Sequence, residues 1–440
     1  MLEVKEGVPT DPAQTKTQYG GVVKSRAVIT GLGIVSPIGI GVGQFWKAAL
    51  ESRSGISAIR AFGDLPLESY RCRVAGQVLD FNPAQYLDAV QAERVDRYAQ
   101  FALVATKEAV ADAGLLMDHE NPHRVAVIVG AGMGGMVMGE REITQLYRAK
   151  RPNRVHPNFI PTITLNSASG IVAMAQGAKG PNLTISTACS SSAHAIGQAL
   201  TCIRTGQADV VMTVGADASI TPLVFAGFCS LRALSTGFND EPERASRPFD
   251  RARDGFVMGE GAGALIIESL PHARKRKARI YGEVVGYAAT SEAYHMVIPR
   301  EDGAEVATTM SLALHDAGVP PSGVDYINAH ATSTQIGDAV EVRAIRQLFK
   351  DRADRIVVNA TKSMVGHTLG AAGAIGAITC ALALETGQVH PTINYDEPDP
   401  ACKLRGISAQ AQERAIRIAL LNAFGFGSNN AAVVFKKFVR

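Results

Sequence analysis

The chain has 440 residues, of which 46% are hydrophobic and 19% are charged. This composition can bury a large core and argues against global disorder, and the length predicts two or three lobes. The formal net charge is only +3, so we expect no nucleic-acid partner and no membrane partner. Six scattered cysteines form no CxxC pair and no zinc-ligand spacing, which predicts reduced thiols, a cytoplasmic location and no metal site.

Residues 1–25 are polar, contain several acidic side chains and show no hydrophobic periodicity. They predict a flexible N-terminal tail rather than a secretory signal or transit peptide. Farther along, Gly, Ser or charged residues interrupt the apolar stretches well short of the length of a membrane span.

From residue 26 onward, strand-like runs alternate with helix-like runs. Several of the strand-like runs are continuously apolar, which is typical of strands covered on both faces. The alternation predicts an α/β architecture. The expected strands are Ala27–Gly31, Val125–Gly130, Leu183–Thr187, Val210–Gly215, Ala264–Glu268, Arg279–Tyr287, Val324–Asn328, Arg355–Ala360, Ile416–Asn422 and Ala432–Lys436. The expected helices are Arg97–Ala113, Ser191–Arg204, Glu305–Ala317, Asp338–Phe349 and Leu369–Glu385.

Two segments of the chain are similar to each other. Ile196–Gln207 and Ile375–Gln388 are both small-residue helices ending in TGQ, and an apolar strand follows each of them at some distance. This similarity suggests two related halves, residues 26–275 and 276–440, although Ala/Gly-rich helices can also resemble each other by chance.

A glycine motif follows the expected strand at Val125–Gly130. Gly130, Gly132 and Gly135 fit the GxGxxG pattern of nucleotide-binding turns. Such a site also needs an acidic residue at the end of the next strand. The corresponding segment, Arg148–Asn158, is basic and has no strand signal, so we interpret the glycines as a close-packing turn.

One cysteine differs from the other five in its setting. Cys189 lies in the segment STACSSS, between an apolar strand and an Ala-rich helix. Near a helix N-terminus, the helix dipole favours a thiolate, and free backbone N–H groups can face a developing oxyanion. We therefore predict that Cys189 is a nucleophile and that the remaining cysteines are buried and inert.

Two of the ten histidines follow apolar strands and enter turns rich in Gly, Ser and Thr. These are His330, at the end of VDYINAH, and His367, within KSMVGHTLGAAGA. The carboxyl ends of strands are where active sites of α/β proteins gather. Lys362 lies five residues before His367 and could hold an ordered charge near such a site.

These segments together resemble the β-ketoacyl-acyl-carrier-protein synthases, closest to the type II, elongating enzymes. The resemblance runs from about residue 26 to residue 437 and rests on seven motifs in the family's order. They are ITGLGIVSPIG (29–39), GAGMGGM (130–136), STACSSSAHA (186–195), RPFDRARDGFVMGEGAG (247–263), NAHATSTQIGDAVE (328–341), TKSMVGHTLGAAGA (361–374) and NAFGFGSNNA (422–431).

The resemblance implies a thiolase-like fold of two βαβαβαββ halves in a layered αβαβα arrangement, and a homodimer. It implies that Cys189 accepts an acyl chain as a thioester and that the backbone N–H groups of Cys189 and Phe426 form an oxyanion hole. His330 and His367 would stabilise the enolate formed when malonyl-carrier protein loses carbon dioxide, and Lys362 would order their surroundings. Phe426 would also act as a gate.

Further roles follow from the same resemblance. Thr332 and Thr334 match positions that bind the phosphopantetheine arm, and Met133 matches the far end of the acyl pocket or is plain core. The partner would be acyl carrier protein, whose acidity requires a basic docking face, and no cofactor or metal is implied. Candidate docking residues, which could equally be solvated surface arginines, are Arg94, Arg154 and Arg232.

The sequence departs from the family pattern at four positions. Ala331 replaces a usual Gly and is expected to narrow the turn near the pantetheine. Ser428 and Asn429 replace the Gly-Thr of the gating loop, which puts its mobility in question. Gly376 replaces a Glu of the fatty-acid type, and this change leaves a polyketide or polyene pathway open.

Related enzyme classes can be compared on the same residues. A biosynthetic thiolase needs a second cysteine in the loop GFGSNN, which has none, and initiating or chalcone-type synthases have Asn where this chain has His367. A non-catalytic, pocket-shaping subunit of a ketosynthase heterodimer would lack the nucleophile, yet Cys189 is present. That subunit remains the alternative to an enzyme.

Overall fold

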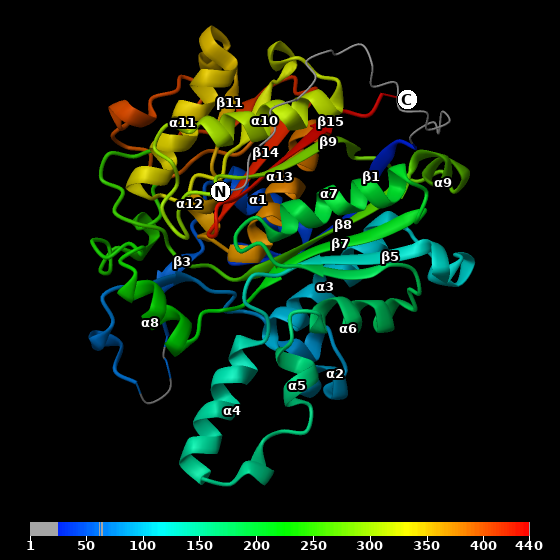
Figure 1. The fold of residues 1–440 in the computed structure, drawn as a ribbon, viewed down its shortest axis with the longest axis vertical. Helices are drawn as coiled ribbons and strands as arrows, with labels where there is room; N and C mark the ends of the chain where they lie inside the picture. Colours follow the sequence, from blue (N-terminus) through cyan, green and yellow to red (C-terminus); the bar gives the residue numbers. More distant parts are fainter. Residues whose placement is uncertain (1–24, 61, 63–64, 440) are drawn as a thin grey trace, which may run out of the picture.

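The computed structural model describes residues 25–439 except positions 61, 63 and 64. All but the last residue of the predicted N-terminal tail lies outside the described residues. Among those that are described, eleven strands form one mixed sheet, in the order β11-β10-β14-β15-β9-β1-β8-β7-β5-β6 with β2 paired to β1. The α/β prediction is confirmed (Figure 1).

The N-terminal half contributes strands β1 (Ala27–Ser36), β2 (Gly39–Ile40), β3 (Ile56–Ala58), β4 (Val74–Gly76), β5 (Val125–Gly130), β6 (Asn182–Ile185), β7 (Val210–Asp217) and β8 (Gly261–Ser269). Its helices are α1 (Val42–Leu50), α2 (Ala89–Arg94), α3 (Arg97–Ala113), α4 (Met136–Ala149), α5 (Phe159–Ile163), α6 (Ser167–Gln176), α7 (Ser191–Arg204), α8 (Pro222–Ser230) and α9 (Leu270–Lys275).

The C-terminal half contributes strands β9 (Gly282–Ser291), β10 (Tyr326–Asn328), β11 (Val357–Asn359), β12 (Gln388–Val389), β13 (Gln412–Glu413), β14 (Ile418–Gly425) and β15 (Asn429–Lys436). Its helices are α10 (Ala304–Ala317), α11 (Gln335–Phe349), α12 (Lys362–Val365) and α13 (Ala372–Thr386).

The strand order shows that the two halves repeat one topology. Outward from the centre, the N-terminal half runs β1-β8-β7-β5-β6 and the C-terminal half runs β9-β15-β14-β10-β11. In each half the first three strands are antiparallel neighbours and the outer pairings are parallel. The halves join through a short antiparallel pairing of β1 with β9. The two similar segments of the sequence occupy equivalent places, α7 before β7 and α13 before β14, so the predicted repeat is confirmed.

Helices cover both faces of the strands and produce the layers. The helix α3 packs on β1, β8 and β7, and α10 packs on β9 and β15. The helices α7 and α13 form the central layer, where they contact each other and strands of both halves. Because neighbouring elements surround α13, nearly all of its residues are buried. Such helices are apolar on all faces rather than amphipathic.

One segment, Leu369–Thr386, is long and apolar enough to cross a membrane, although the sequence had suggested that no stretch was. This segment includes α13, and 89% of it is buried inside the molecule. A buried central helix passes the same length and composition test as a membrane span, so the finding fits a core helix.

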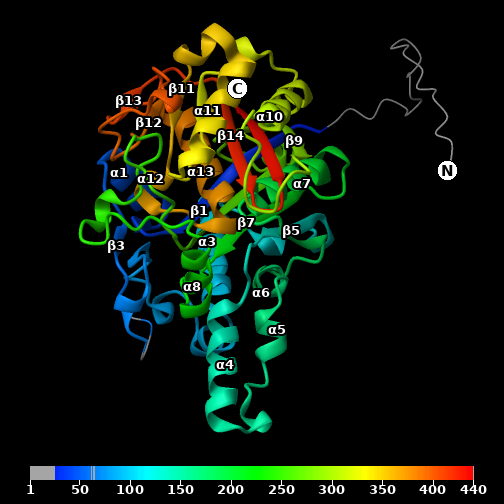
Figure 2. The same ribbon diagram turned by 60° about the vertical axis from the view of Figure 1, so that its left-hand side comes forward.

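A helical arm extends away from the sheet. It is built from α4, the basic segment after it and α5, and it projects at the lower end of the molecule (Figures 1 and 2). The helix α4 begins directly after the Gly130–Gly135 turn. The glycine motif therefore leads into this arm.

Candidate active site

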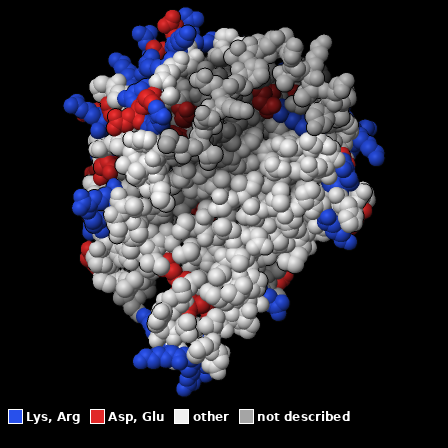
Figure 3. All heavy atoms as spheres, in the orientation of Figure 1, with Lys and Arg blue, Asp and Glu red and all other residues white. Residues whose placement is uncertain are grey.

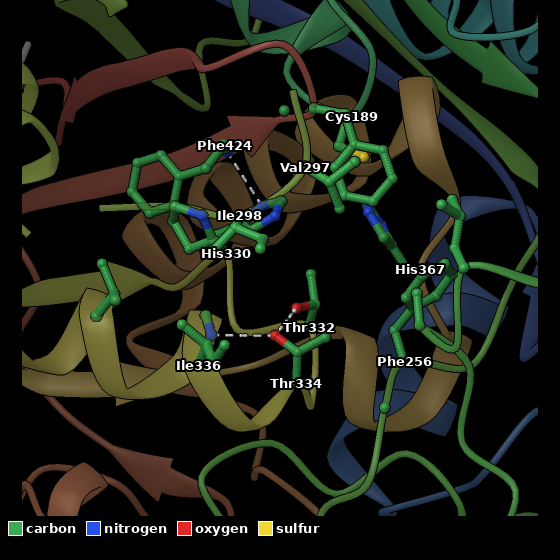
Figure 4. A pocket seen from close by; sticks show the side chains of 18 of the residues that line it. Cys189, Phe256, Val297, Ile298, His330, Thr332, Thr334, Ile336, His367 and Phe424 are labelled. Atoms are coloured by element: carbon green, nitrogen blue, oxygen red, sulfur yellow. Dashed lines mark hydrogen bonds between the residues drawn. The ribbon is translucent and has the colours of Figure 1, made fainter. Parts of the chain in front are cut away.

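A cavity of about 330 Å³ opens between the two halves. Its lining includes Cys189, His330 and His367, which arise from three separate segments, and it continues past Thr332 and Thr334. Figure 4 shows the sulfur of Cys189 and both imidazole rings facing one space, with the two threonines farther along it. The structure thus brings together the nucleophile and the two histidines predicted from sequence.

The turn that carries Cys189 is held by its neighbouring serines. Ser190 Oγ donates to the Thr187 carbonyl at 2.8 Å, and Ser191 Oγ donates to the Ala188 carbonyl at 2.6 Å while accepting from the Thr187 N–H at 2.9 Å. Ala188 adopts a left-handed φ of 51°, a conformation that costs about 1–3 kcal/mol without such support. The STACSSS motif therefore folds into a fixed turn that places Cys189 two residues before the start of α7.

Burial dominates the protonation of Cys189. The side chain is buried, and burial raises the pKa of its thiol to about 12, against the opposing effects of the Lys362 ammonium and the Phe426 and Cys189 N–H groups. The helix N-terminus had suggested a favoured thiolate, but the low-polarity surroundings outweigh that effect. Cys189 is consequently a thiol at neutral pH, and a role as nucleophile would require it to lose this proton.

Phe426 approaches the Cys189 turn because the preceding residue is a glycine. A Cβ at Gly425 would lie 2.5 Å from the Thr187 carbonyl oxygen and 3.2 Å from the Cys189 nitrogen. Only glycine allows the end of β14 to come this close. The close approach fits the expected use of the Cys189 and Phe426 N–H groups as paired donors.

We predict that Gly425→Ala slows acyl transfer to Cys189 by roughly 10²–10³-fold, the usual cost of losing one oxyanion donor. The added methyl must push the Phe426 N–H away from the turn. Rapid-quench intact-mass spectrometry of the acyl-enzyme measures the rate. Gly43→Ala is the control, because its Cβ meets nothing within 4 Å; equal rates in both variants would contradict the role of Gly425.

His330 is oriented from both sides. The Glu341 carboxylate accepts the N–H groups of His330 and Ala331 at 2.9 and 2.8 Å, and Asn422 donates to it at 2.9 Å. The Phe424 N–H donates to Nδ1 of His330 at 3.2 Å (Figure 4). A neutral imidazole whose Nδ1 accepts must carry its proton on Nε2. The Nε2–H group of His330 is therefore available as a hydrogen-bond donor.

The two histidine rings lie perpendicular with centroids 5.5 Å apart. Burial, followed by the nearby Lys362 charge, holds the pKa of both imidazoles well below the usual range. Lys362 donates to the His330 carbonyl at 2.5 Å, and burial lowers its own pKa to about 8 while Glu341 opposes the shift. At neutral pH the site therefore presents two neutral imidazoles beside an ammonium group.

Thr332 and Thr334 lie in a turn that other segments hold in place. Their hydroxyls are 3.1 Å apart, and Thr334 also caps α11 through the Gly337 N–H at 3.2 Å. The buried Arg253 donates to the Thr334 and Gln335 carbonyls at 3.0 and 2.7 Å. The motif RPFDRARDG (247–255), one of the seven that carry the family resemblance, thus shapes this wall.

Glu341 and Arg253 are site-supporting residues that sequence reasoning missed. Both are charged side chains inside long family motifs. Their burial, at 1% and 3% exposed, is the signal that a role exists. Charge type and motif membership alone could not show which backbone groups they bind.

The remaining predicted positions divide between the cavity and the outside. Arg232 lines the cavity. Met133 is 36% exposed and is not among the lining residues. Arg94 ends α2 and Arg154 lies on the helical arm, where both are exposed and away from the cavity lining.

The methyl of Ala331 packs in the apolar core of the C-terminal half and is not among the residues that line the cavity. The residue adopts a φ of 27°, held by the Glu341 hydrogen bond to its N–H. Gly376 is buried within α13, where a Cβ would lie 2.6 Å from Asn328 Oδ1, and the cavity does not reach it.

Ser428 and Asn429 add hydrogen bonds to the loop after Phe426. Ser428 Oγ donates to the His295 carbonyl at 3.0 Å, and Asn429 Nδ2 donates to the Phe426 carbonyl at 3.1 Å. Ser428 takes a left-handed φ of 66°, which glycine would adopt without strain. These two side chains therefore tie the loop to the segment 292–296 and to itself.

Over the described residues, no group of three or more His, Cys, Asp or Glu side chains is arranged to hold a metal ion. The groups gathered around Cys189 are instead thiol, imidazole, ammonium and backbone amide.

Comparison with known families covers most of the chain. Residues 24–273 match the family described as beta-ketoacyl synthase, N-terminal domain, and residues 281–396 match beta-ketoacyl synthase, C-terminal domain. Curated relatives named 3-oxoacyl-[acyl-carrier-protein] synthase 2 include one from Synechocystis, 44% identical over 94% of this chain and 99% of its own. Another, from Staphylococcus aureus strain COL, is 45% identical over 94% of this chain and 98% of its own.

Solved structures with the same fold include the ketosynthase complex of a type II PKS acyl-carrier protein. One of its chains aligns with a TM-score of 0.87 at 35% identity, covering 94% of this chain and 100% of that chain. A beta-ketoacyl synthase from Burkholderia phymatum also gives a TM-score of 0.87, at 32% identity with the same coverage. The chain belongs to the β-ketoacyl synthase family, with its thiolase-like fold.

Proposed function

We propose that this protein is a 3-oxoacyl-acyl-carrier-protein synthase that elongates fatty acids by decarboxylative Claisen condensation with malonyl-carrier protein. The observation that carries the proposal is the placement of Cys189 and two neutral histidines around one cavity, with a threonine-lined path leading from them. The relatives named 3-oxoacyl-[acyl-carrier-protein] synthase 2, at 43–45% identity, support it.

The first step transfers the acyl chain to Cys189. The sulfur attacks the thioester carbonyl of the acyl-carrier protein while the thiol proton passes to the departing pantetheine thiol. The N–H groups of Cys189 and Phe426 stabilise the oxyanion of the tetrahedral intermediate. A covalent intermediate divides a difficult three-component reaction into two simpler steps.

The second step forms the carbon–carbon bond. The malonyl thioester carbonyl accepts a hydrogen bond from Nε2–H of His330 and lies beside His367. Loss of carbon dioxide leaves an enolate whose negative charge these neutral donors stabilise, and Lys362 adds positive charge nearby. The enolate carbon attacks the Cys189 thioester, the sulfur leaves as a thiolate, and a proton taken up from water restores the thiol. Thiol, imidazole and amide groups handle every charge change, so we propose no cofactor.

The cavity mouth supports an acidic carrier protein as the donor of both substrates. Three exposed apolar side chains line the cavity beside Arg232: Leu231, Ile298 and Ile336. A positive charge within an apolar rim suits a carrier whose helices present acidic and apolar side chains. Thr332 and Thr334, inside this rim, are placed to bind the pantetheine arm. We propose a cytoplasmic location, consistent with six unpaired cysteines.

We propose a homodimer formed through β6. This strand ends the sheet, whereas the opposite edge, β11, is covered by an additional bridge between Val358 and Ile407. Leu183 on β6 is 43% exposed, and Met174 on the neighbouring α6 is 76% exposed. Figure 3 shows that the face crossed by α7 carries few charged side chains. Open edge strands with apolar surroundings pair with another chain.

Leu183→Glu is expected to shift the protein from twice the chain mass toward the 46.5 kDa monomer. Two copies of β6 would then bring buried carboxylates close together, which costs several kcal/mol. Light scattering after size-exclusion chromatography measures the mass. Leu312→Glu, on α10 at 47% exposed, is the matched control and should remain a dimer; a wild-type monomer would refute the dimer.

The proposed function is tested with acyl-carrier proteins of graded chain length and malonyl-carrier protein. We expect β-ketoacyl-carrier products, detected by intact mass, with a length profile of saturated fatty acyl chains. A profile restricted to short or polyunsaturated polyketide chains would favour the polyketide alternative. Neither acylation nor decarboxylation with any substrate would favour the pocket-shaping subunit.

A further inference from the structure

A buried carboxylate lies behind the cavity and binds two loops at once. Asp217, at the end of β7, has no exposed surface. Its Oδ2 accepts the N–H groups of Gly132 and Gly370, each at 2.9 Å, and its Oδ1 accepts from Ser219 Oγ at 2.8 Å. The Met133 N–H also contributes. The proposed mechanism makes no use of this charge.

The two loops meet directly at this carboxylate. A Cβ at Gly370 would lie 2.3 Å from the Gly132 nitrogen and 2.8 Å from Oδ2 of Asp217. A Cβ at Gly132 would lie 2.6 Å from the same oxygen. Both glycines are therefore required for contact with Asp217. The steric contacts explain why the motif at 130–135 has a glycine at position 132.

Each loop leads to residues that pack around Cys189. Gly370 follows Leu369, which lines the cavity and belongs to the same apolar cluster as Cys189. Leu369 adopts a left-handed φ of 49°, a strained conformation for a branched side chain that needs support from its neighbours. Three residues before Gly370 lies His367. Gly132 precedes Met133, and Met136 at the end of that turn packs against the Cys189 cluster.

We propose that Asp217 is a positioning residue that ties the Gly132–Met133 turn to the Leu369–Gly370 turn and thereby sets which acyl chain lengths the cavity accepts. This inference rests on the proposed function for its consequence, although the tie itself is a feature of the fold. Burial raises the pKa of Asp217 to about 6, and its hydrogen bonds oppose the shift. It is therefore ionised at neutral pH, as a strong acceptor of several N–H groups must be.

The first test compares Asp217→Ala and Asp217→Asn with wild type for acylation of Cys189 by carrier-bound chains of 4 to about 16 carbons. We expect Asp217→Ala to change the ratio of long-chain to short-chain rates by roughly tenfold or more, the scale of one charge-assisted hydrogen bond. Asp217→Asn retains one acceptor oxygen and should restore part of the ratio. A lower folded fraction would reduce all rates equally, so this ratio separates positioning from stability.

Glu108→Gln is the matched control. Its carboxylate also binds two backbone N–H groups, those of Ile34 and Val42 at 2.8 and 2.7 Å, but it does not line the cavity. We expect its ratio of chain-length rates to equal that of wild type. An unchanged ratio in Asp217→Ala, or the same change in Glu108→Gln, would overturn the proposal.

The second test needs no substrate and measures the hydrogen bonds by which Asp217 joins the two turns. Amide hydrogen exchange in Asp217→Ala should become roughly ten- to hundredfold faster at Gly132, Met133 and Gly370, while strands β14 and β15 exchange as in wild type. Unchanged exchange at these three amides would overturn the proposal even if the wild-type protein proved inactive. Faster exchange with no acylation in wild type would retain the tie and reject the proposed function.

Discussion

Cys189→Ala is expected to lower condensation by roughly 10⁴-fold or more, because removing a covalent nucleophile eliminates the intermediate. The same variant should still decarboxylate malonyl-carrier protein, since His330, His367 and Lys362 remain in place around the cavity. Rapid-quench mass spectrometry measures both reactions on one sample, as loss of carbon dioxide from the malonyl group and as growth of the acyl chain.

Loss of condensation with decarboxylation retained would distinguish removal of the nucleophile from a general loss of structure. Cys229→Ala is the control, because Cys229 is a half-buried thiol on α8 outside the cavity lining. It should retain condensation within a few fold. If Cys189→Ala still condensed, or if Cys229→Ala lost activity equally, a different nucleophile would have to be sought.

His330→Ala is expected to lower decarboxylation by roughly 10²–10³-fold, the cost of removing one preorganised donor to a developing oxyanion. The reason is the tautomer: the Phe424 N–H occupies Nδ1, so Nε2 carries the proton that the enolate oxygen needs. Acylation of Cys189 should change much less, because its oxyanion faces backbone amides. Single-turnover assays of each half-reaction measure the two rates separately.

The control for this variant is His315→Ala on α10, because His315 is exposed and does not line the cavity. We expect it to leave both half-reactions unchanged. Equal losses of acylation and decarboxylation in His330→Ala would contradict the assignment and point to a general loss of structure.

Much of the fold followed from local sequence. The helices Arg97–Ala113 and Ser191–Arg204 and the strand Val125–Gly130 have the predicted bounds. Each of these begins or ends with a local signal, such as the Asp96 cap of α3 or the Gly114 that ends it in the left-handed conformation. The repeat was visible because α7 and α13 are both packed on all sides and so share small residues.

Other elements depend on distant contacts that a linear pattern does not contain. The strand expected at Arg279–Tyr287 begins only at Gly282, although the Tyr281 N–H already donates to the Ile29 carbonyl of β1. The helical arm containing α4 was not predicted. Its contacts with the fold come from distant segments: Asp96 accepts the Met138 N–H, and Glu140 accepts the N–H groups of Leu223 and Val224 on α8.

The site shows the same division. Cys189, His330, His367 and Lys362 could be selected by residue type and position at strand ends. The protonation of Cys189 could not, because it depends on burial by segments from both halves. The packing of the Ala331 methyl could not be read from sequence either, because its neighbours in the C-terminal core come from distant elements. Asp217 and Glu341 bind backbone N–H groups, which carry no sequence signal.

Decarboxylative condensation at Cys189 can be followed through a single labelled carbon atom. Malonyl-carrier protein labelled with ¹³C in its free carboxyl is mixed with enzyme already acylated at Cys189 by a saturated chain. We expect the label to leave entirely as carbon dioxide and the carrier product to be longer by two carbons, with a β-keto group. The enzyme should return to its free-thiol mass. Retention of the label in the product, or an acyl-enzyme that never elongates, would contradict decarboxylative condensation at Cys189.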